Sequence, residues 1–191
     1  MKDYQEILAL VLNEVTEALH RVPPESLDSL RAQLRAARRI FVAGKGRSGL
    51  HMRAFAMRLM HLGLVVHVVD DVTTPAIGAG DALVVASGSG QTSSLVQYAD
   101  KARTLQASLI LITASSESPM RQQADMVVYI PVSSPKSNPT NSETTLLISA
   151  QPLANLFEQC LGLLLDMVVI QLMDELGVNS EQMFARHANL E

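Results

Sequence analysis

The chain has 191 residues, of which 48% are hydrophobic and 18% charged, and its formal net charge at pH 7 is −4. This length and composition predict one globular domain with a sizeable core and exclude an intrinsically disordered chain. The negative charge, without a dominant Lys/Arg stripe, argues against a nucleic-acid-binding protein. The single cysteine excludes an internal disulfide and is typical of a reducing compartment.

The first residues lack the basic segment followed by an apolar segment that marks a secretion signal, so we expect a cytoplasmic protein. The most apolar run, Leu161–Met173, is interrupted by Asp166 and Gln171 and is too short to cross a bilayer. It is therefore predicted to be a buried helix, and no membrane partner is expected.

Two helices are predicted before the first strand, within residues 1–37. From Tyr4 to about His20, apolar residues recur at the i, i+3, i+4, i+7 spacing of an amphipathic helix. Pro24 suits the first turn of a second helix, which runs to about Ala37.

Short β-rich runs and helical stretches alternate through residues 38–131. The predicted strands are Arg39–Ala43, Val65–Val69, Ala82–Ala86, Leu109–Thr113 and Val127–Pro131. The predicted helices between them are Ser48–Leu62, Thr92–Gln106 and Pro119–Ala124. The alternation predicts an α/β fold, a flavodoxin-like three-layer sandwich whose five-stranded parallel sheet is flanked by helices. Ligands of such sheets bind beyond the C-terminal ends of the strands.

The last part of the chain is predicted to be a loop, a long helix and a tail. Residues 132–151 are rich in Ser, Pro, Asn and Thr, and loops of this length are often functional. A helix from about Pro152 to Leu176 follows, with Gly177 as its C-cap. The helix and tail occupy residues 152–191 of what we expect to be a single domain, 1–191.

One local pattern occurs twice: an apolar strand runs into a Gly/Ser turn that opens a helix. The turns are Gly44–Gly49 and Ser87–Thr92. Glycines let the backbone approach a ligand closely, and helix N-termini attract anions. Together the turns carry five hydroxyl or guanidinium groups, on Arg47, Ser48, Ser87, Ser89 and Thr92. Although serines can simply cap helices, two adjacent turns of this kind predict a site for a small phosphorylated sugar.

The first turn also satisfies the G-x-G-x-x-G pattern of dinucleotide-binding proteins. Asp70 lies about twenty residues further on, where an acid would bind the ribose. Two features argue against this alternative. The serines of the second turn would occupy the space that the cofactor needs, and no separate substrate domain is recognisable after the sheet.

Several segments resemble the sugar isomerase (SIS) domain and, within it, the 6-phospho-3-hexuloisomerases. The segments that carry the resemblance are Gly46–Leu50, Ala54–Gly63, Thr73–Ile77, Ser87–Gly90, Leu156–Gln159 and Arg186–Glu191. The Ser-Gly-Ser-Gly turn indicates only the superfamily, whereas the Ala54–Gly63 segment and the His-Ala-Asn-Leu-Glu ending are more specific. The chain departs from the family pattern at Lys45, where a small residue is expected, and at Gln91, where Glu is expected.

The resemblance implies an isomerase that interconverts 3-hexulose 6-phosphate and fructose 6-phosphate by proton transfer through an enediol or enediolate, without a metal or organic cofactor. Two alternatives remain. One is an isomerase of another sugar phosphate, such as arabinose 5-phosphate or a heptose phosphate. The other is a non-catalytic sugar-phosphate-sensing module. Sensors usually carry a DNA-binding domain, and the residues before the first strand contain no basic recognition helix.

Glu158 is the predicted catalytic base, because partial burial near the start of the last helix would favour proton abstraction. A surface glutamate is the simpler interpretation, and Glu143 is the next candidate. The resemblance implies that His187 and His61 move protons, although a terminal histidine is often solvated and one on an apolar helix is often a core residue. Arg47 is expected to hold the phosphate or an enediolate oxygen.

The apolar N-terminal and C-terminal helices carry more hydrophobic surface than one small sheet needs to cover it. We therefore expect a homodimer or homotetramer, in which a neighbouring subunit's histidine completes each site.

Overall fold

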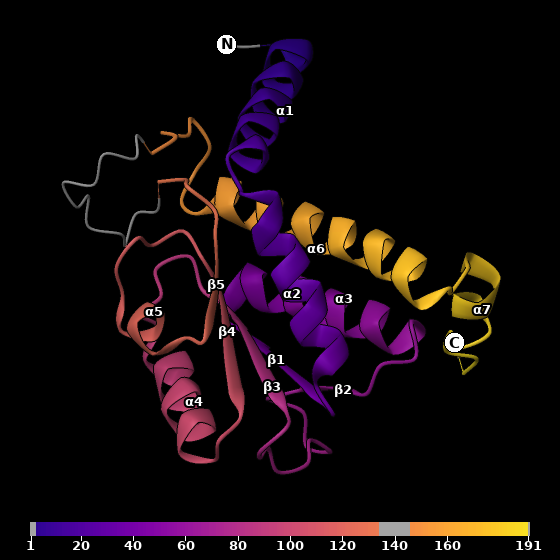
Figure 1. Ribbon diagram of the computed structural model, residues 1–191. Helices are drawn as coiled ribbons and strands as arrows, with labels where there is room; N and C mark the ends of the chain where they lie inside the picture. Colours follow the sequence, from indigo (N-terminus) through magenta and orange to yellow (C-terminus); the bar gives the residue numbers. More distant parts are fainter. Residues whose placement is uncertain (1–2, 134–145, 191) are drawn as a thin grey trace.

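The computed structural model describes residues 3–133 and 146–190. All of its strands lie in one five-stranded parallel sheet of order β2-β1-β3-β4-β5 (Figure 1). The strands are β1 Ile40–Gly44, β2 Val66–Val68, β3 Ala82–Ala86, β4 Ser108–Thr113 and β5 Met126–Tyr129. The α/β class and the parallel sheet predicted from the sequence are confirmed. The chain adds β2 on one side of β1 and the later strands on the other side, so the strand order switches direction between β1 and β3. The crevice between these two strands is therefore the expected ligand site.

Helices cover both faces of the sheet (Figure 1). On one side lie α1 Tyr4–His20, α2 Pro24–Ala36, α3 Gly46–His61 and α6 Asn155–Leu176, and on the other lie α4 Ser93–Thr104 and α5 Pro119–Gln123. The short helix α7, Ser180–Phe184, follows α6. The N-terminal end of α1 projects beyond the rest of the molecule.

Alternate side chains of each strand enter the two cores. Val42 and Val84 pack on the side of α3 and α6, whereas Phe41 and Leu83 pack on the side of α4 and α5. All four side chains are buried. Burying one side chain of this size stabilises the fold by about 1.5–3 kcal/mol, so both faces of the sheet need their helices.

The structure corrects two expectations at the C-terminal end. The apolar run Leu161–Met173 was expected to be too short to cross a membrane. It lies within helix α6, whose 22 residues are long and apolar enough to do so by length and composition alone. Half of its most apolar window is buried, and it packs against α1 and α3 as a core helix. Helix α7 was missed within the predicted tail; a capping box formed by Asn179 and Gln182 begins it. Of the predicted loop 132–151, residues 134–145 lie outside the described part of the chain.

A buried carboxylate joins the segments at the N-terminal edge of the sheet, opposite the two Gly/Ser turns. Asp81 accepts hydrogen bonds from Arg39 Nη2 at 2.6 Å, Arg38 Nε at 3.1 Å and the Gly78 N–H at 2.9 Å. The Arg39 hydrogen bond is the largest cause that holds the pKa of the Asp81 carboxyl far below its usual range. These contacts fix the start of β1 against the start of β3.

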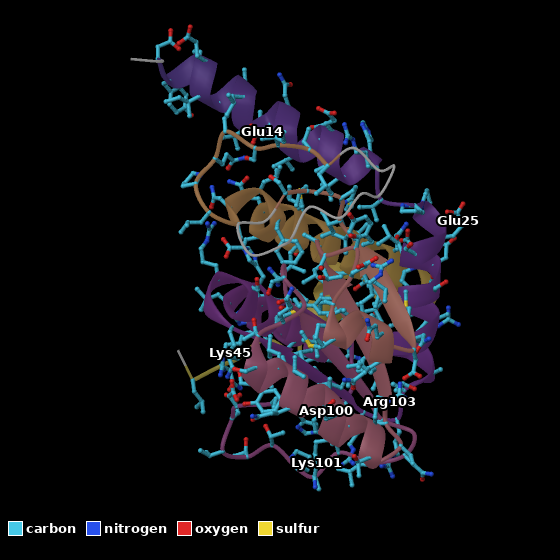
Figure 2. The ribbon with its side chains drawn as sticks, turned by 90° about the vertical axis from the view of Figure 1, so that its left-hand side faces the viewer. Glu14, Glu25, Lys45, Asp100, Lys101 and Arg103 are labelled. Atoms are coloured by element: carbon cyan, nitrogen blue, oxygen red, sulfur yellow. The ribbon has the colours of Figure 1, made fainter. Side chains whose placement is uncertain are left out.

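We predict that Asp81→Asn lowers the free energy of unfolding at neutral pH by about 2 kcal/mol, because hydrogen bonds to a charged group are lost. The native pKa is lowered, so this stabilisation is complete above the ordinary pKa of 3.8 and is lost as the pH falls toward the native value. Urea unfolding at a series of pH values should therefore show a wild-type advantage that narrows below about pH 4. Asp100→Asn, which changes an exposed acid on α4 (labelled in Figure 2), is the control; an equal loss in both variants would contradict the prediction.

Candidate active site

The first Gly/Ser turn brings α3 directly to the end of β1. A Cβ atom on Gly49 would lie 2.7 Å from the carbonyl oxygen of Gly44, so only glycine allows the two backbones to come this close. Gly46 has a φ of +58°, which favours glycine as well. The tight turn places Arg47 and Ser48 in the first turn of α3.

The second turn is held by its own hydroxyl groups. Ser87 Oγ accepts the N–H of Gly90 at 3.2 Å, and Ser89 Oγ accepts the N–H of Gln91 at 3.3 Å. Each hydroxyl that accepts a backbone N–H still has its own O–H to donate to an anion. A Cβ on Gly90 would lie 2.2 Å from Ser118 Oγ, so the turn depends on glycine there.

The two turns form walls of one pocket of about 510 Å³. The third wall is the segment from Pro152 to Glu158, at the start of α6. All of the predicted substrate-binding residues and the predicted base line this pocket: Arg47, Ser48, Ser87, Ser89, Thr92 and Glu158. Its volume lies in the range of small-molecule sites.

An ion pair crosses the pocket. Arg47 Nη1 lies 3.0 Å from Glu158 Oε2, and the Glu158 side chain is only 17% exposed. Arg47 also donates a hydrogen bond to Asn155 Oδ1. Phe157, the neighbour of Glu158, packs so closely over Gly88 that a Cβ there would lie 3.2 Å from its ring. The first turn therefore meets α6 at Arg47 and Glu158, and the second turn meets α6 at Phe157.

A second charged group stands at the rim of the pocket. Lys45 Nζ lies 2.7 Å from Asp70 Oδ2, and Tyr98 donates its hydroxyl to Asp70 Oδ1 at 2.8 Å. The Lys45 hydrogen bond is the largest cause of the lowered pKa of Asp70, and the same bond raises the pKa of Lys45. Asp70 is thus already bound within the chain, which argues against its serving a dinucleotide ribose.

His61 and His187 lie together, but in a different pocket from Glu158. Their rings stack with centroids 5.3 Å apart, and both line a pocket of about 470 Å³ with Ile170 of α6 and Phe184 of α7. Burial, followed by the nearby His187 and Arg58, lowers the pKa of His61, so its imidazole is neutral at neutral pH. Along α6, Glu158 and Ile170 are about 18 Å apart at 1.5 Å per residue. One chain therefore does not bring the histidines to its own Glu158.

Sequence reasoning missed part of the third wall. Leu153 lines the pocket with a φ of +55°, and Asn155 orients Arg47. An asparagine at the start of a helix is a weak signal, because it usually caps the helix. Glu143, the second candidate base, lies outside the described residues.

Cys160 lies two residues after Glu158 on α6 and is buried. Burial raises the pKa of the Cys160 thiol to about 12, so this cysteine beside the site is not a reactive thiolate. Among residues 3–133 and 146–190, His, Cys, Asp and Glu side chains form no group of three or more that could hold a metal ion.

The chain is similar to known proteins over nearly its whole length. The SIS domain family model matches residues 33–156. A Bacillus subtilis (strain 168) protein named 3-hexulose-6-phosphate isomerase is 41% identical over 186 residues, which cover 97% of this chain and 98% of the relative. A protein of the same name from Mycobacterium gastri is 44% identical over 99% of this chain and 92% of the relative.

Solved structures agree with the sequence relatives. The structure of MJ1247 from Methanococcus jannaschii, from which a function as 3-hexulose-6-phosphate isomerase was inferred, has a TM-score of 0.83 and 31% identity. The match covers 97% of this chain and 99% of that chain. A putative sugar-phosphate isomerase from Listeria monocytogenes is 20% identical, with a TM-score of 0.76 and coverage of 98% and 99%, and shares the fold. The chain therefore belongs to the SIS domain family and, within it, groups with the 3-hexulose-6-phosphate isomerases.

Proposed function

We propose that this protein interconverts 3-hexulose 6-phosphate and fructose 6-phosphate. The observation that carries the proposal is the Arg47–Glu158 pair, which lies in a pocket walled by two Ser/Gly turns. The pocket combines a carboxylate, a guanidinium and a cradle of hydroxyl and N–H groups. Full-length similarity to relatives named for this reaction supports the same substrate.

The two turns bind the phosphate. The hydroxyls of Ser48, Ser87, Ser89 and Thr92 line the pocket at the N-terminal ends of α3 and α4. Helix N-termini present free N–H groups and a positive dipole end, both of which favour a dianion. The phosphate therefore anchors the sugar, so that its carbon chain extends toward Glu158.

Glu158 removes the proton from C3 of open-chain fructose 6-phosphate, and the electrons of the C–H bond form the C2=C3 bond of an enediolate with its charge on the C2 oxygen. The Arg47 guanidinium stabilises this oxygen. The protonated Glu158, whose carboxyl proton exchanges with water, then delivers a proton to C2, and loss of the O3 proton leaves the carbonyl at C3. Moving a proton from O3 to O2 needs a second acid–base group, for which the histidines are suited.

A second copy of the chain supplies that group. Exposed apolar side chains continue over α1, α6 and α7, including Leu12, Leu163, Ile170 and Phe184. Apolar surface of this extent is typical of an interface. Within one chain the His61–His187 pocket is separate from the Arg47–Glu158 pocket. In a homodimer or homotetramer, the His61–His187 pocket of one subunit would lie against the Arg47–Glu158 pocket of its neighbour. The single buried cysteine suits a cytoplasmic location.

A sensor is the second candidate. The chain is 28% identical over 156 residues to the HTH-type transcriptional regulator YfhH of Escherichia coli (strain K12), and the match covers 79% of this chain and 51% of the regulator. A sensor would bind sugar phosphates without turning them over.

We predict that Glu158→Gln lowers kcat by about 100-fold or more, because the variant has no base for proton abstraction. Fructose 6-phosphate is incubated with the protein and an aldolase that cleaves 3-hexulose 6-phosphate, and formaldehyde release is followed. Glu25→Gln, which alters an exposed acid on α2, is the matched control. A near-normal rate in Glu158→Gln would transfer the role of base to another residue.

The double substitution Ser87→Ala/Ser89→Ala should raise KM for fructose 6-phosphate by about tenfold or more, since two hydrogen bonds to a charged group are lost. The same variant should lose the rise in Tm that millimolar fructose 6-phosphate produces in the wild type. Ser94→Ala is the control, because Ser94 lies on α4 but does not line the pocket. If both KM and the rise in Tm are unchanged, these serines do not bind phosphate.

Subunit mixing tests the shared site. Inactive Glu158→Gln and His187→Ala chains, unfolded and refolded together, should recover activity, because some hybrid sites then combine an intact pocket with an intact histidine. Mixing Glu158→Gln with Ser87→Ala/Ser89→Ala is the control, since both variants damage the same pocket and no hybrid site is intact. The shared site would be refuted if the mixture of Glu158→Gln and His187→Ala chains were as inactive as each variant alone. It would also be refuted if the wild-type protein sedimented as a monomer.

A further inference from the structure

A line of hydrogen bonds connects helix α1 with the Arg47–Glu158 pair. Glu14, on α1 above the loop that leads into α6 (Figure 2), accepts a hydrogen bond from Gln151 Nε2 at 3.0 Å. Gln151 Oε1 accepts one from Asn155 Nδ2 at 2.8 Å. Asn155 Oδ1 accepts one from Arg47, whose guanidinium pairs with Glu158 at 3.0 Å.

The two ends of this line determine the orientation of both amides. An ionised carboxylate can only accept hydrogen bonds, and a guanidinium can only donate them. Gln151 must therefore turn its NH₂ group to Glu14, which leaves its oxygen facing Asn155. Asn155 must then turn its NH₂ group to Gln151, which leaves its oxygen facing Arg47. The carboxylate of Glu14 and the guanidinium of Arg47 thus favour the same orientation of both amides, in which Arg47 meets an acceptor.

Glu14 also holds the backbone of the same segment. Its carboxylate accepts the Ser149 hydroxyl at 2.6 Å and the Ala150 N–H at 2.8 Å. Between this anchor and Asn155, Leu153 lines the pocket with a φ of +55°, a conformation that L residues adopt only when their surroundings impose it. The segment that forms the third wall of the pocket is therefore held in place from α1.

We propose that Glu14 is a positioning residue of the isomerase: through Gln151 and Asn155 it orients the Arg47 guanidinium toward Glu158 and the enediolate oxygen. This inference rests on the proposed function. The hydroxyls proposed to bind the phosphate, on Ser48, Ser87, Ser89 and Thr92, take no part in this line of hydrogen bonds, so phosphate binding does not depend on Glu14. Loss of Glu14 therefore lowers kcat and leaves KM nearly unchanged.

The first test is Glu14→Gln, whose amide presents a donor where the carboxylate accepts the hydrogen bonds of Ser149, Ala150 and Gln151. The formaldehyde-release assay should show kcat reduced by about tenfold, within the range that small displacements of catalytic groups cause, with KM within about twofold of wild type. Glu17→Gln is the matched control, because Glu17 lies on the same helix and pairs with Arg21 on the surface. Equal kcat values in wild type and Glu14→Gln, or an equal loss in both variants, would overturn the proposal.

Gln151→Met breaks the line in its middle without altering α1, and it serves if Glu14→Gln folds poorly. If the line of hydrogen bonds acts as one unit, kcat of the double variant Glu14→Gln/Gln151→Met is no lower than kcat of the worse single variant, because both changes remove the same effect. The proposal would be refuted if the two reductions in kcat multiplied in the double variant. It would also be refuted if kcat fell only in variants whose Tm had fallen. A wild-type protein inactive on fructose 6-phosphate would instead refute the proposed function.

Discussion

The contact between Arg47 and Glu158 joins two parts of the fold that are far apart in the sequence. It forms only because α3 starts at the very end of β1, where Gly44 and Gly49 touch, and because Phe157 packs on Gly88. The close approach of these backbones brings two helix N-termini and one carboxylate into the same crevice. The parallel sheet, whose strand order switches direction between β1 and β3, supplies the crevice, and glycine lets the backbones around it come close together.

Two groups of charged residues lie at opposite ends of the parallel strands. At the N-terminal ends of the strands, the buried Asp81 accepts hydrogen bonds from Arg38, Arg39 and the Gly78 N–H and joins the starts of β1 and β3. At the C-terminal edge, Arg47 and Glu158 remain in contact with an open pocket, as proton transfer to a substrate requires. The separate pocket of His61 and His187 completes this arrangement in the proposed oligomer, where one subunit supplies the base and its neighbour supplies the histidines.

Much of this architecture could be predicted from the sequence, because it depends on local patterns. The apolar runs predicted the strands, and the two turns that were predicted to form one site line one pocket in the structure. Glu158 was singled out by its place near the start of the last helix and by the family resemblance. The roles of Glu14 and Asn155 could not be predicted, since packing of α1 on α6 brings them into line. Helix α7 was missed because five residues show too little periodicity.

The claim that a base moves the carbonyl between C2 and C3 is tested most directly by hydrogen exchange. Fructose 6-phosphate is incubated with the protein in D₂O, and the sugar is followed by proton NMR. The account predicts that the C3 proton is replaced by deuterium while both C1 protons are retained, and that this exchange depends on the protein. Exchange at C1 instead would identify an aldose–ketose isomerase, and a sugar that binds without any exchange would identify a sensor; either result would contradict the account.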